Sequence, residues 1–246
     1  IVDIGMVTDT PRTLRRKVAY GTKNMAKMPA MTREEAYRAI CTGIGLVQEK
    51  QAEGYEILAT GEMGIGNTTT SSAVTAVLLG REPSDVTGRG AGLSDRGLEK
   101  KKQVIRQAIE LLAPDPADPV DVLAKVGGFD LAGLTGVFLA GAAAGIPVII
   151  DGFISLTAAL IAARIAPACV PYLIPSHASK EPASAMLLQA LHLEPGICMD
   201  MCLGEGSGAV ALLPFLDMTA AVYGQMGTFS DIHVEEYEDY TEAHPC

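Results

Sequence analysis

The stretch YEILATGEMGIGNTTTSSAVTAVLL, residues 55–79, joins three local patterns in one run. Its first six residues form a short β-branched and aromatic segment, and residues 73–79 are apolar and compatible with a helix. Between them lies a glycine-rich turn that opens onto threonine and serine hydroxyls. The order predicts a strand, a tight turn and a helix start.

Similar units recur along the chain. Further strand-like runs lie at residues 1–6, 147–153, 171–176 and 196–201, and helical patterns lie at residues 33–50, 95–113, 155–166 and 181–193. Alternation of this kind is typical of repeated βαβ units. We therefore expect an α/β fold: a three-layer, doubly wound, mostly parallel sheet with helices on both faces. Ligands of such sheets bind at the carboxyl ends of the strands.

The expected domain organisation is simple. Residues 1–230 are predicted to form one large α/β domain, and residues 231–246 an acidic C-terminal tail. APDPADPVD, residues 113–121, is a proline-rich segment expected to be a surface connection.

Charge limits the choice of partners. Twenty-nine acidic and nineteen basic residues give a formal net charge of −10. Such a chain repels nucleic acid and anionic membrane surfaces at long range. An anionic ligand must therefore be held by local groups.

One segment has the length of a membrane span. Residues 131–150 are uncharged, but Gly145 and Pro147 divide them into an Ala/Gly-rich helix and a short strand. We therefore expect a buried helix and a central strand, and no membrane association. The first residues read as a strand without a basic leader, which suggests a cytoplasmic protein and a chain that is a fragment.

Five cysteines are scattered along the chain. This odd number in a mid-sized chain favours reduced thiols and a cytoplasmic setting. Cys198 and Cys202 could form half of a metal site, but no histidine cluster accompanies them. They are interpreted as buried small hydrophobic residues.

The turn at residues 61–72 resembles two phosphate-binding motifs without matching either. The lysine position of a P-loop is Asn67, and Thr69 stands where a dinucleotide fingerprint has its third glycine. The shared physics still applies, because glycines let the backbone approach an anion and a helix start points free N–H groups at it. A single phosphate fits better than a triphosphate. The alternative is an ordinary turn capped by Asn67 or a threonine.

Three further glycine turns precede helices, at residues 88–92, 125–130 and 203–209. The second of these turns, KVGGFD, carries no individual candidate. Lys100, Lys101 and Lys102 follow the first turn, and one of them could turn inward toward a phosphate, although such a triplet is usually a solvated face. Glu205 is the carboxylate of the last turn, where helix capping explains it as well as catalysis does.

Polar residues also follow two predicted strands. Asp151 ends one strand, where ligand contact and helix capping are both common. Ser176, His177 and Ser179 occupy a comparable exit and are expected to line the site.

Six ordered blocks carry a resemblance to a known family: GEMGIGNTT, GRGAGL, VGGFDLAGL, IPVIIDGF, PSHASKEP and LGEGSGA. Together they resemble nicotinate-nucleotide-dimethylbenzimidazole phosphoribosyltransferases of the cobalamin lower-ligand pathway, over essentially the whole chain. That family transfers the ribose 5-phosphate of nicotinate mononucleotide to 5,6-dimethylbenzimidazole or a related base. It releases nicotinate and forms an α-ribotide.

The resemblance implies roles for individual residues. Glu205 would be the general base, which typically contributes about 10²- to 10⁴-fold to the rate. The remaining predicted contacts bind substrate. The phosphate is expected at Gly64, Gly66, Asn67, Thr68, Gly88, Gly90 and Lys101. Ribose or base contacts are expected at Glu62 and Asp151. Ser176, Leu203 and Gly204 are expected to bind substrate without a specified part.

The resemblance also implies a homodimer and a reaction that needs neither a metal nor another cofactor. Family members carry an additional N-terminal segment that walls the base pocket, so this chain is expected to be a trimmed large domain. Two alternatives stay open. One is a mononucleotide-binding module without catalysis, and the other is a nucleoside-triphosphate hydrolase, which Asn67 disfavours.

Overall fold

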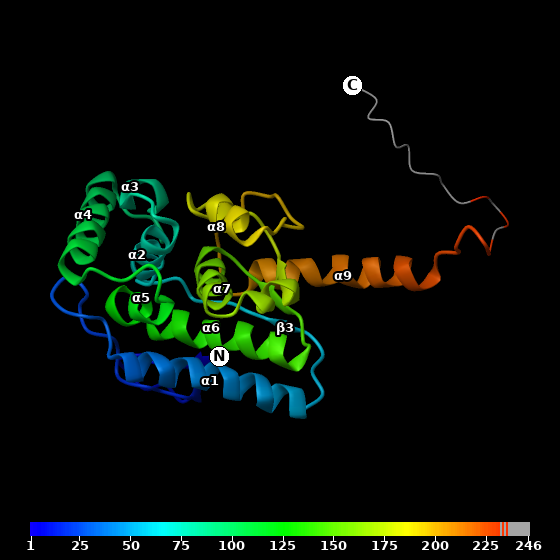
Figure 1. Cartoon of the computed structure of the whole chain (residues 1–246), viewed down its shortest axis with the longest axis horizontal. Coiled ribbons are helices and arrows are strands. Elements are labelled where there is room, and N and C mark those ends of the chain that lie inside the picture. Colours follow the sequence, from blue (N-terminus) through cyan, green and yellow to red (C-terminus); the bar gives the residue numbers. More distant parts are fainter. Residues whose placement is uncertain (232, 234, 236–246) are drawn as a thin grey trace, which may run out of the picture. The chain divides into compact units, whose positions relative to one another are not determined.

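The computed structural model describes residues 1–231, 233 and 235 of the chain (Figure 1). The predicted acidic tail lies mostly outside the described residues. The described elements, in chain order, are β1 (Val2–Asp3), β2 (Leu14–Arg15), α1 (Arg33–Ala52), β3 (Leu58–Ala59), α2 (Thr68–Leu79), α3 (Pro83–Val86), α4 (Asp95–Leu112), α5 (Pro119–Val126), α6 (Phe129–Ala144), β4 (Val148–Ile150), α7 (Phe153–Ile165), the 3₁₀ helix η1 (Pro167–Tyr172), β5 (Leu173–Pro175), α8 (Ser184–Leu191) and α9 (Ser207–Gln225).

A three-stranded parallel sheet, in the order β3-β4-β5, confirms the predicted α/β class. Val148 of β4 pairs with Leu58 of β3 and Leu173 of β5. All three residues of β4 are fully buried, as expected for the central strand of a parallel sheet. The helices α6 and α7 both pack against this strand.

Two strand predictions were wrong in detail. Residues 1–6 contribute only β1, which pairs with β2 in a separate parallel pair and not with the main sheet. Residues 196–201 form no strand, because only Ile197 bridges to His177. The main sheet is therefore smaller than the alternation of patterns suggested.

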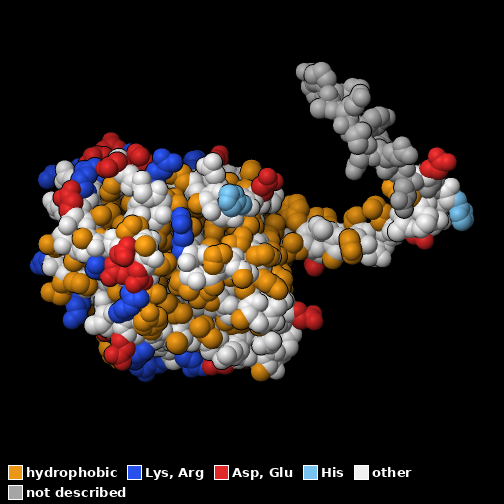
Figure 2. Space-filling model, in the orientation of Figure 1, with side chains coloured by type: hydrophobic (Ala, Val, Ile, Leu, Met, Phe, Trp, Pro, Cys, Tyr) orange, Lys and Arg blue, Asp and Glu red, His pale blue; other side chains and the backbone are white. Residues whose placement is uncertain are grey.

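The uncharged segment at residues 131–150 folds as predicted. It supplies most of α6 and all of β4, and Gly145 ends the helix in the left-handed conformation with φ of 72°. One helix among the described residues, α9, is long and apolar enough to cross a membrane by length and composition alone. Figure 2 shows hydrophobic side chains along it, and Phe215, Met218, Val222 and Tyr223 are exposed.

Glycines allow α1 and α6 to pack side by side (Figure 1). A Cβ atom on Gly43 of α1 would overlap the carbonyl oxygen of Gly133. Likewise, a Cβ atom on Gly136 of α6 would overlap the carbonyl oxygen of Ile40. The contact is therefore made by backbone against backbone, which larger side chains would prevent.

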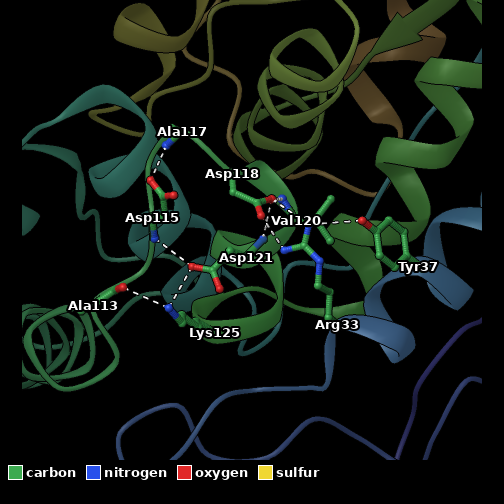
Figure 3. A network of polar contacts seen from close by, with 9 residues as sticks. All are labelled: Arg33, Tyr37, Ala113, Asp115, Ala117, Asp118, Val120, Asp121 and Lys125. Carbon is green, nitrogen blue, oxygen red and sulfur yellow. Dashed lines mark hydrogen bonds and ion pairs between the residues drawn. The ribbon is translucent and has the colours of Figure 1, made fainter.

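The proline-rich segment at residues 113–121 is held by a polar network (Figure 3). Asp118 accepts hydrogen bonds from the N–H groups of Val120 and Asp121, both at 3.1 Å, and so caps α5. Its other oxygen lies 2.6 Å from Nη1 of Arg33 at the start of α1. This guanidinium lowers the pKa of Asp118. The segment predicted to be a surface connection thus runs into the helix α5, which was not predicted.

The chain divides into two units, Ile1–Ala211 and Leu212–Cys246. All side chains that form the candidate site belong to the first unit, as does the first turn of α9. The proposed boundary at residue 230 stays a prediction.

Candidate active site

The loop after β3 turns sharply before α2 begins. Gly64 and Gly66 have φ of 81° and 86°, in the left-handed region that glycine adopts without strain. Asn67 occupies the N-cap position, but its side chain does not cap the helix. The first N–H groups of a helix have no partner inside it, so the start of α2 can donate hydrogen bonds to an anion.

Lys101 of α4 reaches this helix start. Its side chain is buried, and Nζ donates to Oγ1 of Thr68 and to the carbonyl oxygen of Gly88, both at 2.9 Å. Gly90 also lies against Thr68, because a Cβ atom on this glycine would come within 2.6 Å of the threonine hydroxyl. Four residues predicted to bind phosphate are thus neighbours.

The other two lysines of the triplet do not point inward. Lys100 is exposed, and Lys102 forms an ion pair with Glu99 over 2.8 Å. Burial lowers the pKa of Lys101, and the negative charge of Glu181 partly opposes this effect. Lys101 is therefore the member of the triplet that can present a cation at the helix start.

Glu181 was missed in the sequence. Its Oε1 accepts a hydrogen bond from the N–H of Gly90 at 3.1 Å, and its carboxylate packs directly against Gly88. Its Oε2 is buried and has no hydrogen-bond partner within the described part of the chain. The block PSHASKEP contained this residue, but its position as the first residue of a helical pattern suggested nothing beyond that helix.

Glu205 lies in an unusual backbone turn. Its φ is 59°, and the φ values of Gly204 and Gly206 are 78° and 81°, so three successive residues are left-handed. The N–H of Glu205 donates to the carbonyl oxygen of Glu62 at 2.9 Å. Gly61 packs on the same turn, where a Cβ atom would come within 2.5 Å of the nitrogen of Gly206. The first and last glycine loops therefore meet backbone to backbone.

Helix capping was the alternative role for Glu205, but its carboxylate does not cap α9. Asp151 caps this helix instead: its Oδ1 accepts from the N–H groups of Gly208 at 2.8 Å and Ala209 at 3.2 Å. Its Oδ2 accepts from the N–H of Gly206 at 2.9 Å. Glu205 is exposed, so its carboxylate is available to a ligand.

The exit of β5 is buried more deeply than expected. Ser176 is fully buried, and its hydroxyl donates to the carbonyl oxygen of Asp151 at 3.0 Å. The same hydroxyl lies 2.9 Å from Nδ1 of His177. Burial lowers the pKa of His177, and Asp151 opposes this effect. These buried side chains contact one another and the backbone of Asp151 beneath the surface of the site.

Asp130, at the start of α6, is a second residue that sequence reasoning missed. The side-chain amide of Asn67 donates to its Oδ2 at 2.9 Å. Burial of the carboxyl group and the nearby charge of Glu62 raise the pKa of Asp130 to about 6. Glu62 itself accepts a hydrogen bond from the N–H of Gly64 at 2.7 Å. Asp130 thus fixes the side chain of Asn67 in the loop between β3 and α2.

The surroundings of these loops include one open cavity and an exposed leucine. The cavity has a volume of about 350 Å³ and is lined by Ala178, Ser179, Lys180, Cys198, Met199 and Asp200. Leu203, beside the Glu205 turn, is 72% exposed. Cys198 and Cys202 are exposed free thiols, which corrects their interpretation as buried residues.

The structure sorts the predicted site residues into two adjoining groups. Thr68, Gly88, Gly90 and Lys101 form the first group. Glu62, Gly204 and Glu205 form the second, and residues 62–68 connect the two. The fold and this site define an α/β protein with a helix start whose N–H groups can donate to an anion and an exposed carboxylate at the carboxyl end of a parallel sheet.

Comparison with known proteins makes the class specific. The family model described as "Phosphoribosyltransferase" matches residues 1–234. The chain belongs to this phosphoribosyltransferase family, which confirms the resemblance carried by the six sequence blocks.

Similar proteins carry a more detailed name. Relatives from Ruminiclostridium cellulolyticum and Acetivibrio thermocellus, each named nicotinate-nucleotide--dimethylbenzimidazole phosphoribosyltransferase, are both 50% identical over 240 residues. In each case the match covers 97% of this chain and 68% of the relative. The crystal structure of CobT from Thermus thermophilus is 42% identical, with a TM-score of 0.87, and the match covers 96% of this chain and 70% of that one.

Proposed function

We propose that this protein transfers the ribose 5-phosphate of nicotinate mononucleotide to 5,6-dimethylbenzimidazole or a related base. The products are nicotinate and an α-ribotide, the precursor of a cobamide lower ligand. Family membership and the names of relatives 50% identical to this chain support the reaction. The single structural observation that supports it best is the buried Lys101 ammonium beside Thr68 and Gly88.

The nucleotide phosphate would bind at the start of α2. Backbone N–H groups of Gly64, Gly66, Asn67 and Thr68 would surround it, with Gly88, Gly90 and the charge of Lys101 completing the site. This arrangement explains how a chain with a net charge of −10 can hold an anion. A single ammonium suits a monophosphate better than a triphosphate.

Glu205 would act as the general base. As it removes the N–H proton of the benzimidazole ring, the other ring nitrogen attacks C1′ of the ribose. The bond between C1′ and the pyridinium nitrogen breaks, and its electron pair stays on nicotinate, which leaves with a neutral ring. Attack opposite to the leaving group inverts the configuration at C1′. Because the pyridinium ring is already a good leaving group, the site acts mainly by positioning both rings.

Glu62, Leu203 and Gly204 would contact the ribose or the base, since they adjoin Glu205. The support for this assignment is the hydrogen bond from Glu205 to Glu62 and the exposure of Leu203. We also propose a cytoplasmic homodimer. Its support is the family resemblance and the four free thiols in the described part of the chain.

The reaction can be tested by mass spectrometry. The protein is incubated with nicotinate mononucleotide and 5,6-dimethylbenzimidazole, other benzimidazoles or phenols, and the α-ribotide is sought. Reactions without base serve as controls. Formation of the ribotide supports the proposal. Failure with every base, together with calorimetric binding of nicotinate mononucleotide, would favour the alternative of a binding module. Absence of binding at millimolar ligand would reject both.

A further inference from the structure

The carboxylate of Asp151 accepts hydrogen bonds from the backbone of residues 206–209. Asp151 is 2% exposed, and its two oxygens accept three N–H groups, from Gly206, Gly208 and Ala209. A buried carboxylate satisfied in this way has little left to offer a ribose hydroxyl. These three bonds give Asp151 a role in the fold beside the ligand contact predicted from its position at a strand exit.

The backbone of Asp151 is fixed by all three strands of the main sheet. Asp151 follows β4 directly, and its N–H lies 3.4 Å from Oγ1 of Thr60, the residue after β3. Its carbonyl oxygen accepts the hydroxyl of Ser176, the residue after β5. The carboxylate thus projects from a backbone position that contacts residues at the ends of β3 and β5.

The turn that Asp151 holds is a strained one. Glu205 is a non-glycine residue with a positive φ, and such residues persist where the surroundings determine their conformation. The N–H of Glu205 is fixed by Glu62, and the next N–H along the chain, that of Gly206, is fixed by Asp151. The negative charge at the start of α9 is also favourable for the helix dipole.

We propose that Asp151 is a positioning residue for catalysis: its carboxylate clamps the backbone on the C-terminal side of Glu205 and so sets the direction of the Glu205 side chain. The proposal rests on the proposed function, in which Glu205 is the base. It assigns Asp151 no contact with substrate. A displacement of about 1 Å in such a group can lower a rate about 10²-fold.

The first test is a double-mutant cycle. We expect Asp151→Asn, which replaces one acceptor oxygen with an NH₂ group facing backbone N–H groups, to lower kcat about 10²-fold and leave KM for nicotinate mononucleotide unchanged. In the Glu205→Ala background the same change should have no further effect beyond about 2-fold, because the residue it positions is already gone. Equal losses in both backgrounds would overturn the proposal.

The matched control is Asp118→Ala. Asp118 also caps a helix through two N–H groups, but at α5 and with none of its contacts in the site. Loss of the Asp118 carboxylate should lower stability and leave kcat unchanged.

A milder second variant, Ser176→Ala, removes the hydroxyl that donates to the Asp151 carbonyl and should lower kcat less than Asp151→Asn does. Full activity of Asp151→Asn would contradict the clamp.

Hydrogen exchange gives a readout that does not depend on turnover. In Asp151→Asn the amides of residues 204–209 should exchange faster than in the parent, whereas those of α6 should not. Unchanged exchange at residues 204–209 would overturn the clamp even if the parent made no ribotide. Failure of the proposed reaction and failure of the clamp are thereby distinguished.

Discussion

The backbone N–H of Glu205 donates to the carbonyl oxygen of Glu62 over 2.9 Å, although the two residues belong to loops that lie far apart in the sequence. The bond joins the loop that leads to α2 with the turn that precedes α9. Gly61 also packs against Gly206 in the same place, where a Cβ atom would come within 2.5 Å of the nitrogen of Gly206. The loop proposed to bind phosphate and the turn that carries the proposed base are therefore joined backbone to backbone.

Removing the carboxylate of Glu205 should separate turnover from nucleotide binding. Glu205→Ala is expected to lower kcat about 10²-fold or more, because general base catalysis is lost. Affinity for nicotinate mononucleotide, measured by calorimetry, should stay nearly unchanged. Glu194→Ala, which changes another exposed glutamate, serves as the control. Equal kcat in the Glu205 variant and the parent would exclude this residue from the mechanism.

Lys101 and Lys100 offer a matched pair on consecutive positions of α4. Lys101→Met should weaken binding of nicotinate mononucleotide about 10-fold or more, since a hydrogen bond to a charged group contributes about 1.5–3 kcal/mol. Lys100→Met should change affinity little, because that side chain is exposed. Both affinities can be measured by calorimetry at one ionic strength. Equal weakening by the two variants would point to a general charge effect and contradict a phosphate contact by Lys101.

Local sequence signals predicted the helices and the central strand well. Residues 33–50 were expected to be helical, and α1 indeed begins with a capping box between Thr32 and Glu35. Gly145 divided the uncharged segment into a helix and a strand at the point where α6 ends. Such features depend on neighbouring residues, and the sequence displays them directly.

Long-range contacts could not be predicted in the same way. Asp130 meets Asn67 across 63 positions, and Glu181 meets Gly90 across 91 positions. Their roles arise only when loops converge at one edge of the sheet. The strand predicted at residues 196–201 failed for a related reason, because a strand needs continuous pairing with a neighbour and here only Ile197 forms a bridge, to His177 beyond the end of β5.

Glycine packing between α1 and α6 gives a prediction on stability. Gly43→Ala should lower the free energy of unfolding by about 1–3 kcal/mol, since its Cβ atom would overlap the backbone of α6. Gly45→Ala, two residues further along α1, is the control, because a Cβ atom there meets nothing within 4 Å. That change should stabilise the protein by up to about 1 kcal/mol through helix propensity. Urea unfolding followed by circular dichroism measures both, and equal effects would contradict close packing at Gly43.

Asp130 predicts a specific pH dependence of stability. Its pKa in the folded protein is about 6, above the ordinary value of 3.8, so between these values the folded state binds more protons than the unfolded state. Stability should therefore fall as the pH rises from about 4 to about 7, by at most about 3 kcal/mol. Asp130 as a whole residue is half-buried, which lowers the effect below this limit. Asp130→Asn removes this titration and keeps an acceptor for Asn67, so its free energy of unfolding should vary less over the same range. Urea unfolding at pH 4.5 and 7 measures this free energy, and Asp85→Asn, at an exposed position, is the control. The same pH dependence in Asp130→Asn and the parent would show that the Asp130 carboxyl group is not its source.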